Sequence, residues 1–210
     1  MSLQDFQRAL TAMTLDVSLA NAVHDCGEQA LAGYEITPRE ARRLVAVARQ
    51  PGMALNCTLA RANRFGPIHD AFAMTCVLLG RDLRGVLDEL WSGRRPANYQ
   101  LTGEELPFAE AVEARIASGL AGNAYLAEVL AYERACLELA MLVRHAAAPE
   151  SLSAESRWLS FNHDPRLLFA ALEQSRAPPV GLPEAPYRVR VTLVGGELEV
   201  TTFEVQPATP

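Results

Sequence analysis

The sequence predicts a mainly α-helical protein with a small C-terminal α+β part, in which an N-terminal helical bundle precedes a helix and a β-hairpin or small antiparallel sheet. Apolar residues recur every three or four positions as far as residue 145, which is helical spacing. Four prolines then crowd residues 177–186, and two alternating strand-like runs flank Gly195-Gly196. We therefore expect a helical domain over residues 1–147 and a small α+β domain with a C-terminal hairpin over 148–210.

The helical part begins with an amphipathic segment over residues 3–13 and a second one over 17–31, capped by Asp16. Thr37-Pro38-Arg39-Glu40 has the form of a capping box with proline at the first helical position, so a helix should run from there to Gln50. Further helices are expected over 53–65, 67–79, 81–91, 102–118 and 124–145. Ser92-Gly93 ends the helix over 81–91, and a second capping box begins the helix at Thr102.

The C-terminal part should contain a short strand over 158–161 and a helix from Asp164-Pro165 to Gln174. Two strands, 187–194 and 197–205, follow the proline-rich linker. If Gly195 and Gly196 form the turn, Val194 faces Glu197 and Leu193 faces Leu198. We expect the apolar face of this hairpin to pack on the helix over 164–174.

Composition excludes several classes of function. The chain has 210 residues, a formal net charge of −6 and no lysine, so Schiff-base chemistry and a Walker-type phosphate lysine are impossible. No apolar run approaches the ~20 residues of a membrane span, and the first residues lack a secretory signal. We expect a cytoplasmic protein that does not enter a membrane.

No set of residues predicts an active site or a metal site. The four histidines and four cysteines show no ligand spacing, and the sequence contains no GxSxG, GxGxxG or HExxH motif. We interpret the cysteines as reduced core residues, His163 as a turn residue, and Glu133 as part of a solvated or ion-paired helix face. The sequence thus predicts no catalytic residue, no metal ligand and no cofactor in this chain.

Two binding surfaces are predicted instead. A two-stranded hairpin is marginal alone, so either residues 157–161 add a third strand or an edge is open to an extended peptide, and both can hold. The candidate peptide-binding residues are Tyr187, Arg188, Val189, Arg190, Val191, Glu197, Glu199 and Phe203. The polar residues around Gly66-Pro67 form a candidate partner interface, made of Asn63, Arg64, Phe65, His69 and Asp70.

Arginines at 39, 42, 43 and 49 favour an alternative, a helical DNA-binding transcriptional regulator. The negative net charge argues against nucleic-acid binding.

Two stretches of the chain resemble the helical domain of a bacterial family commonly labelled a DNA-binding domain. They are RANRFGPIHDAFAMTCVLLGRDLRGVLDELW and, after it, GNAYLAEVLAYERACLEL. Members of that family accompany multinuclear non-heme iron-dependent oxidases, which modify cysteine-containing precursor peptides. Cys76 departs from the family's pattern. The matching residues are Asn63, Arg64, Asp70, Ala71, Phe72, Leu79 and Gly80 in the first block, and Tyr125, Leu126, Leu130 and Glu133 in the second.

The layout of FNHDPRLLFAALEQ followed by a strand pair is similar to the second domain of those partner proteins, which include the partner subunits of 3-thiaglutamate and methanobactin biosynthesis. The resemblance implies a non-catalytic subunit that binds an iron-dependent TIM-barrel oxidase and recruits the leader of a ribosomally made precursor peptide. It places the iron in the partner enzyme.

Overall fold

The computed structural model describes residues 3–92, 103–120, 122–145, 154–175 and 180–205. The chain forms two compact units, the first made of residues 1–67 and 91–104 and the second of residues 68–90 and 105–210. This division differs from the predicted boundary between 147 and 148. The reason is that α8 (Leu126–His145), which corresponds to the longest predicted helix, packs on the C-terminal strands and so belongs to the same unit as they do.

The first unit is helical, as predicted. It contains α1 (Leu3–Leu15), α2 (Val17–Cys26), a 3-10 turn (Gly27–Leu31), α3 (Pro38–Ala48) and the first part of α4 (Pro51–Ala71). Its core includes Met13, Val23 and Leu44, none of which exposes any surface. Asp16 caps α2 by accepting hydrogen bonds from the Ser18 and Leu19 amides, and this confirms the predicted cap.

The predicted capping box at the start of α3 is confirmed. The hydroxyl of Thr37 accepts a hydrogen bond from the Glu40 amide at 3.3 Å, and the Glu40 carboxylate accepts one from the Thr37 amide at 2.8 Å. Those contacts lower the pKa of Glu40, the backbone hydrogen bond from Thr37 being the main cause. The single acid of α3 is therefore engaged in capping the helix.

The predicted helix break at Gly66-Pro67 is wrong, because α4 continues through Pro67 to Ala71. Proline keeps a helical φ but has no amide to donate to the Asn63 carbonyl. Asn63 lies at an exposed position, where water can take the place of that amide. The chain leaves the helix at Phe72 instead, whose ψ of 42° is not helical and whose side chain is fully buried.

The second unit holds α5 (Ala73–Leu79), a 3-10 turn (Gly80–Asp82), α6 (Leu83–Trp91, whose last residue belongs to the first unit), α7 (Glu105–Ala117), α8 and α9 (Pro165–Ser175). The predicted cap Thr102 lies outside the described residues, and α7 begins at Glu105. No helix in the described ranges is long and apolar enough to cross a membrane.

The sheet of the second unit has three antiparallel strands in the order β1-β2-β3, namely β1 (Glu155–His163), β2 (Glu184–Val194) and β3 (Glu197–Glu204). The hairpin register is the predicted one, since Leu193 pairs with Leu198 and Val194 with Glu197. The first strand extends beyond the predicted residues 158–161, and β2 begins inside the predicted linker.

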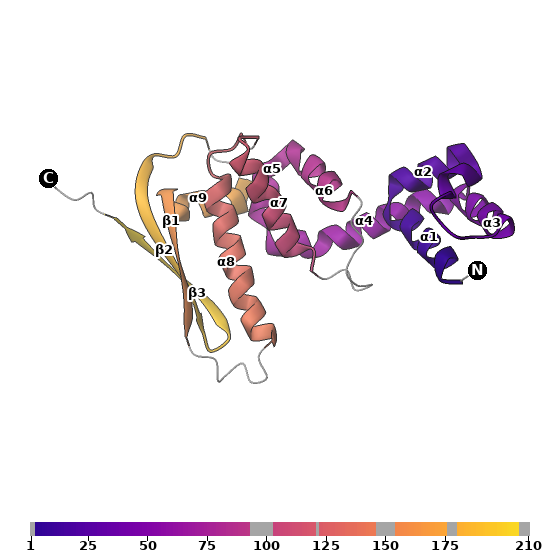
Figure 1. Cartoon of the computed structure of the whole chain (residues 1–210). Helices are drawn as coiled ribbons and strands as arrows, with labels where there is room; N and C mark the ends of the chain where they lie inside the picture. The colour runs from indigo at the N-terminus through magenta and orange to yellow at the C-terminus, as the bar shows by residue number, and fades with distance from the viewer. Residues whose placement is uncertain (1–2, 93–102, 121, 146–153, 176–179, 206–210) are drawn as a thin grey trace. The chain divides into compact units, whose positions relative to one another are not determined.

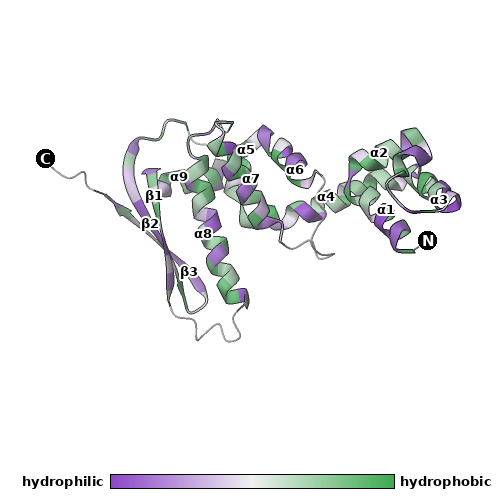
Figure 2. Ribbon diagram, in the orientation of Figure 1, coloured by the Kyte–Doolittle hydropathy of each residue, from purple (hydrophilic) through white to green (hydrophobic). Residues whose placement is uncertain are grey.

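Helix α8 contacts all three strands and lies along the sheet in Figure 1. The alternation of hydrophobic and hydrophilic residues along it is visible in Figure 2. The hairpin was expected to pack on α9, but α9 packs chiefly against α5, and its Phe169 ring centroid lies 5.8 Å from that of Phe161 on β1. With 20 residues against 11 in α9, α8 is long enough to contact every strand of the sheet.

Candidate functional site

The two faces of the sheet differ in burial. Val189, Val191 and Leu193 of β2 expose at most 1% of their surface and point toward the helices. Because successive side chains alternate between faces, Arg188 and Arg190 point the other way, and both are exposed. Strand pairing then sets the rows of this outer face: Trp158, Arg190 and Thr201 form one, and Ser160, Arg188 and Phe203 form the next.

Four of these residues form what we call the outer cluster: Trp158, Arg188, Arg190 and Phe203. The guanidinium carbon of Arg190 lies 5.5 Å from the centroid of the Trp158 ring, and the Trp158 and Phe203 rings lie 5.5 Å apart. Trp158 and Phe203 remain 53% and 44% exposed. A cation on an exposed aromatic ring contributes only about 0.5–1 kcal/mol, so these contacts orient Arg190 and leave much of both rings available to a partner.

Charge changes sign along the outer face. Arg188 and Arg190 lie toward the end of the sheet that holds Phe203, whereas Glu197 and Glu199 lie beside the Gly195-Gly196 turn. All four charged residues are exposed. A partner that lies along the strands would therefore meet cations at one end and anions at the other.

Beside this face, β3 presents an open edge. The Val205 amide donates to the Pro186 carbonyl at 3.0 Å, which identifies that pair as hydrogen-bonded. In an antiparallel pair of strands, hydrogen-bonded residue pairs alternate with non-hydrogen-bonded ones. Residues 203, 201, 199 and 197 therefore also form hydrogen bonds with β2. The amides and carbonyls of Leu198, Val200, Thr202 and Glu204 consequently point away from β2, and among the strands of the described chain none pairs with them.

The structure corrects part of the predicted peptide-binding set. The strand holding Tyr187–Val194 lies between β1 and β3, so both of its edges are used and no peptide can add beside it. Val189 and Val191 are fully buried, and Tyr187 is partly buried on the inner face opposite Phe161. Arg188, Arg190, Glu197, Glu199 and Phe203 are exposed on the sheet.

Of the predicted partner-interface residues, Asn63, His69 and Asp70 are exposed and Phe65 is partly buried. Arg64 cannot take part, because it exposes only 1% of its surface. Asn63, Arg64 and Phe65 belong to the first unit, whereas His69 and Asp70 belong to the second. The prediction placed these residues around a helix break at Gly66-Pro67 that would free backbone groups for a partner, and that break does not exist.

Arg64 instead forms a buried ion pair in the first unit. Its Nε and Nη2 atoms each lie 2.8 Å from Oε1 of Glu104, a residue that is 4% exposed. The guanidinium of Arg64 also lies 4.8 Å from the centroid of the Trp91 ring, and that of Arg61 lies 5.0 Å from it. This cluster joins α4 to the segment before α7.

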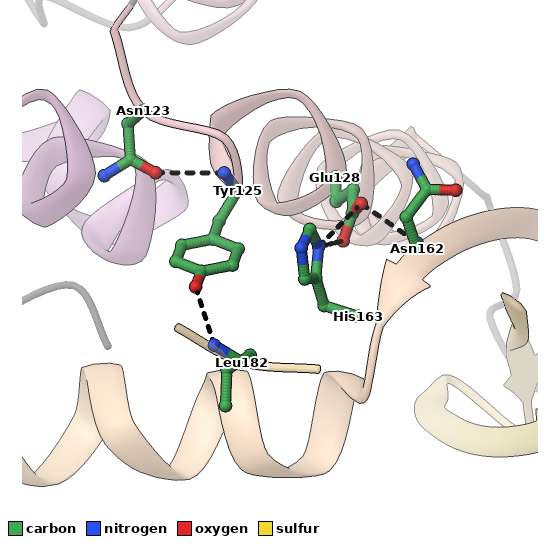
Figure 3. A network of polar contacts seen from close by, with 6 residues as sticks. All are labelled: Asn123, Tyr125, Glu128, Asn162, His163 and Leu182. Atoms are coloured by element: carbon green, nitrogen blue, oxygen red, sulfur yellow. Dashed lines mark hydrogen bonds and ion pairs between the residues drawn. The ribbon is translucent and has the colours of Figure 1, made fainter. Parts of the chain in front are cut away.

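A polar network that the sequence did not predict anchors the sheet in the second unit. Figure 3 shows the Glu128 carboxylate of α8 accepting the Asn162 amide at 2.9 Å and lying 3.2 Å from Nδ1 of His163. The Tyr125 hydroxyl accepts the Leu182 amide at 3.2 Å. His163 was expected in a turn, but it is 7% exposed at the end of β1, where the Tyr125 ring meets its edge.

The burial of this network decides its role. Glu128 and His163 resemble the carboxylate and base of a catalytic pair, yet both are more than nine-tenths buried. A substrate could not reach them without opening the core. They fix the end of β1, and Tyr125 fixes the chain just before β2, so the network positions the strands that carry the outer cluster.

The sequence led us to interpret Glu133 as part of a solvated or ion-paired helix face, but the structure buries it, and it is only 6% exposed. Its carboxyl oxygens accept the Met74 and Thr75 amides at 2.8 and 2.9 Å at the start of α5. Burial raises the pKa of Glu133, against the lowering effect of the hydrogen bonds from Thr75 and Met74. Glu133 is thus a long-range helix cap, and its partners are too distant in sequence for the spacing of α8 to reveal them.

The cysteines are free, and two of them have the predicted core placement. Cys57 and Cys76 are buried, and burial raises the pKa of Cys76 to about 12, so its thiol is protonated and a poor nucleophile at neutral pH. Cys136 is partly buried, and Cys26 is exposed, which corrects the prediction for that residue. In the described ranges no three potential metal-ligating side chains come together.

The arginines of α3 lie on its outward face. Arg39, Arg42 and Arg43 are exposed, while Leu44 and Val45 face the core. These three arginines outnumber Glu40, the one acid of α3, so this face is basic.

Comparison of the chain with protein-family models, with curated proteins and with solved structures gave no match, so the functional assignment rests on the sheet and its surroundings.

Proposed function

We propose that this protein is a non-catalytic binding subunit that takes an extended peptide onto the open edge of β3. The observation that carries the proposal is the outward direction of the amides and carbonyls of Leu198, Val200, Thr202 and Glu204, beside the exposed outer cluster. Main-chain pairing supplies affinity in this mode of recognition, and the side chains beside the edge supply selectivity.

We propose further that the peptide is the leader of a cysteine-containing precursor, and that this chain delivers it to an iron-dependent TIM-barrel oxidase. The family resemblance in residues 61–91 supports this assignment, as does the burial of the carboxylate and histidine that could otherwise act as catalytic groups. The chemistry would then take place on the iron of the partner. An oxidase gene and a short cysteine-containing reading frame beside the gene for this protein would agree with the proposal.

Main-chain pairing is tested with a fluorescent leader peptide and two variants at one position of β3. Thr202→Pro removes an amide that points to the open edge and not to β2, so the hairpin ladder keeps all its bonds. We expect at least a tenfold loss of affinity by fluorescence anisotropy. Thr202→Val keeps the amide and should bind as the wild type does. Circular dichroism checks that both variants are folded.

A second test leaves the protein unchanged. N-methylation of alternate leader residues removes either the amides that face β3 or those that face away from it. One methylated set should lose binding and the other should keep it. Equal binding by both sets would refute strand addition. Co-expression with the neighbouring oxidase tests the remainder, and failure to purify a stable complex would refute the partner assignment.

A second candidate function, DNA binding, is favoured by one observation, the basic outward face of α3 with Arg39, Arg42 and Arg43. Binding through phosphate contacts would weaken steeply with salt. An electrophoretic mobility assay with duplex DNA, comparing the wild type with Arg39→Glu/Arg43→Glu, tests it directly. DNA binding that this double variant abolishes would favour the regulator over the peptide-binding subunit.

A further inference from the structure

Resting on the proposed function, we infer that the open edge selects its peptide by the order of charges and by two alternate apolar residues. The peptide then pairs antiparallel to β3 and carries the pattern acid-x-x-apolar-base-apolar. Each position of this pattern follows from the register of the sheet.

The two apolar positions of the peptide follow from the cross-strand rows of side chains on the inner face, which are buried on β2 but partly exposed on β3. Leu193 and Val191 on β2 expose 1% and 0% of their surface, but their partners on β3, Leu198 and Val200, expose 39% and 45%. In each of these cross-strand pairs the residue on β2 is buried and its partner on the edge strand β3 is exposed. An added strand that placed apolar side chains opposite Leu198 and Val200 would extend these rows, and those two positions are two residues apart.

The charged positions follow from the outer face. Between the inner positions, the added strand points outward opposite Glu199, Thr201 and Phe203. A basic residue opposite Glu199 forms a direct cross-strand pair. Arg188 lies in the row of Phe203, about 10 Å from the added backbone at two strand spacings, which two long side chains can span. An acidic residue opposite Phe203 would meet Arg188.

The direction follows from the other strands. Both pairs in this sheet are antiparallel, and antiparallel pairing is slightly the more stable kind. A strand antiparallel to β3 starts near Phe203 and ends near the turn. Its acid therefore comes first, opposite Phe203, and its base comes four residues later, opposite Glu199. The apolar residues opposite Val200 and Leu198 stand just before and just after that base.

Two synthetic peptides of identical composition test the charge order. One carries Glu-x-x-Val-Lys-Val, and in the other Glu and Lys exchange places, with fluorescein on both. We expect the first to bind the full chain roughly fivefold more tightly at low salt, because two exposed ion pairs become two like-charge contacts in the second. The ratio should fall toward one in 0.5 M salt, where screening is about 4 Å in range.

Charge exchange in the protein provides the reciprocal test. Arg188→Glu/Glu199→Arg should reverse the preference between the two peptides. Arg84→Glu, at a position of α6 whose side chain is 88% exposed, is the matched control and should leave the ratio unchanged. Equal binding of both peptides, tighter binding of the exchanged peptide, or no binding of either would overturn the inference. The proposed function falls separately, if N-methylated leaders all bind alike.

Discussion

Replacement of Arg64 by methionine removes the cation of the buried ion pair and keeps most of the side-chain volume. Glu104, which is 4% exposed, then loses the hydrogen bond from Nε and the ion-pair contact with Nη2 while its carboxylate stays buried. Removal of one partner of a buried pair costs about 3–5 kcal/mol, because the other charge stays buried. Loss of the cation from the Trp91 ring, 4.8 Å away, adds to this cost.

The free energy of unfolding of a domain is about 5–15 kcal/mol, so Arg64→Met removes a large share of it. With a urea dependence of about 2 kcal/mol per molar, a loss of about 4 kcal/mol moves the unfolding midpoint by about 2 M. Trp91 fluorescence in a Trp158→Phe background reports this transition, since Trp91 lies in the first unit and is 9% exposed. The double variant Arg64→Met/Glu104→Leu should recover most of the lost stability.

Arg42→Met is the matched control, because Arg42 is exposed on α3 in the same unit. Its midpoint should stay within about 0.3 M of that of the wild type, which corresponds to the ±0.5 kcal/mol typical of surface substitutions. A midpoint shift below about 0.5 M for Arg64→Met, or a double variant no more stable than the single one, would refute the assignment of Arg64 to the core.

Three other positions give direct tests. Glu133→Ala leaves the Met74 and Thr75 amides without their acceptor and should lower the free energy of unfolding by about 2–3 kcal/mol in urea titrations, whereas a change below 1 kcal/mol would contradict the capping role. Burial raises the pKa of Glu133, so the folded state binds the proton of this carboxyl more tightly than the unfolded state does. As the pH rises from about 4 to 7, the wild type should therefore lose stability relative to Glu133→Gln. A gain in relative stability over this range would contradict the raised pKa. Gly196→Ala, at a φ of 90°, should cost about 1–2 kcal/mol by thermal denaturation, and a neutral effect would mean that the turn differs from the one described. Asp16→Ala should cost about 1 kcal/mol through loss of the α2 cap, and an unchanged melting temperature would argue against that cap.

Local signals explain what could be predicted from the sequence. Asp16 and the Thr37-Glu40 pair cap their helices within three residues, and Gly195-Gly196 sets the register of its own hairpin. Each of these signals acts over a short stretch of chain, so spacing and residue type are enough to reveal it. An open sheet edge was also predicted, from the incompleteness of a two-stranded hairpin, but the prediction left open which of the two hairpin strands bears it.

Long-range pairs explain what could not be predicted. Arg64 meets Glu104 across 40 residues, Glu133 meets Thr75 across 58, and Glu128 meets His163 across 35. Periodicity along one helix says which face is polar, but it does not say which polar residue finds a buried partner on another element. The central position of β2 depends in the same way on the pairing of β1, which is distant in sequence from the hairpin.

The alternating direction of the main-chain groups in β3 has a consequence for hydrogen exchange. The amides of residues 199, 201 and 203 are bonded to β2 and exchange with solvent deuterium only when the hairpin opens. Those of Leu198, Val200, Thr202 and Glu204 face the open edge and exchange without any opening. A single strand thus contains a fast set and a slow set of amides at alternate positions, and a ligand that pairs with the edge would slow the fast set while the slow set serves as an internal reference.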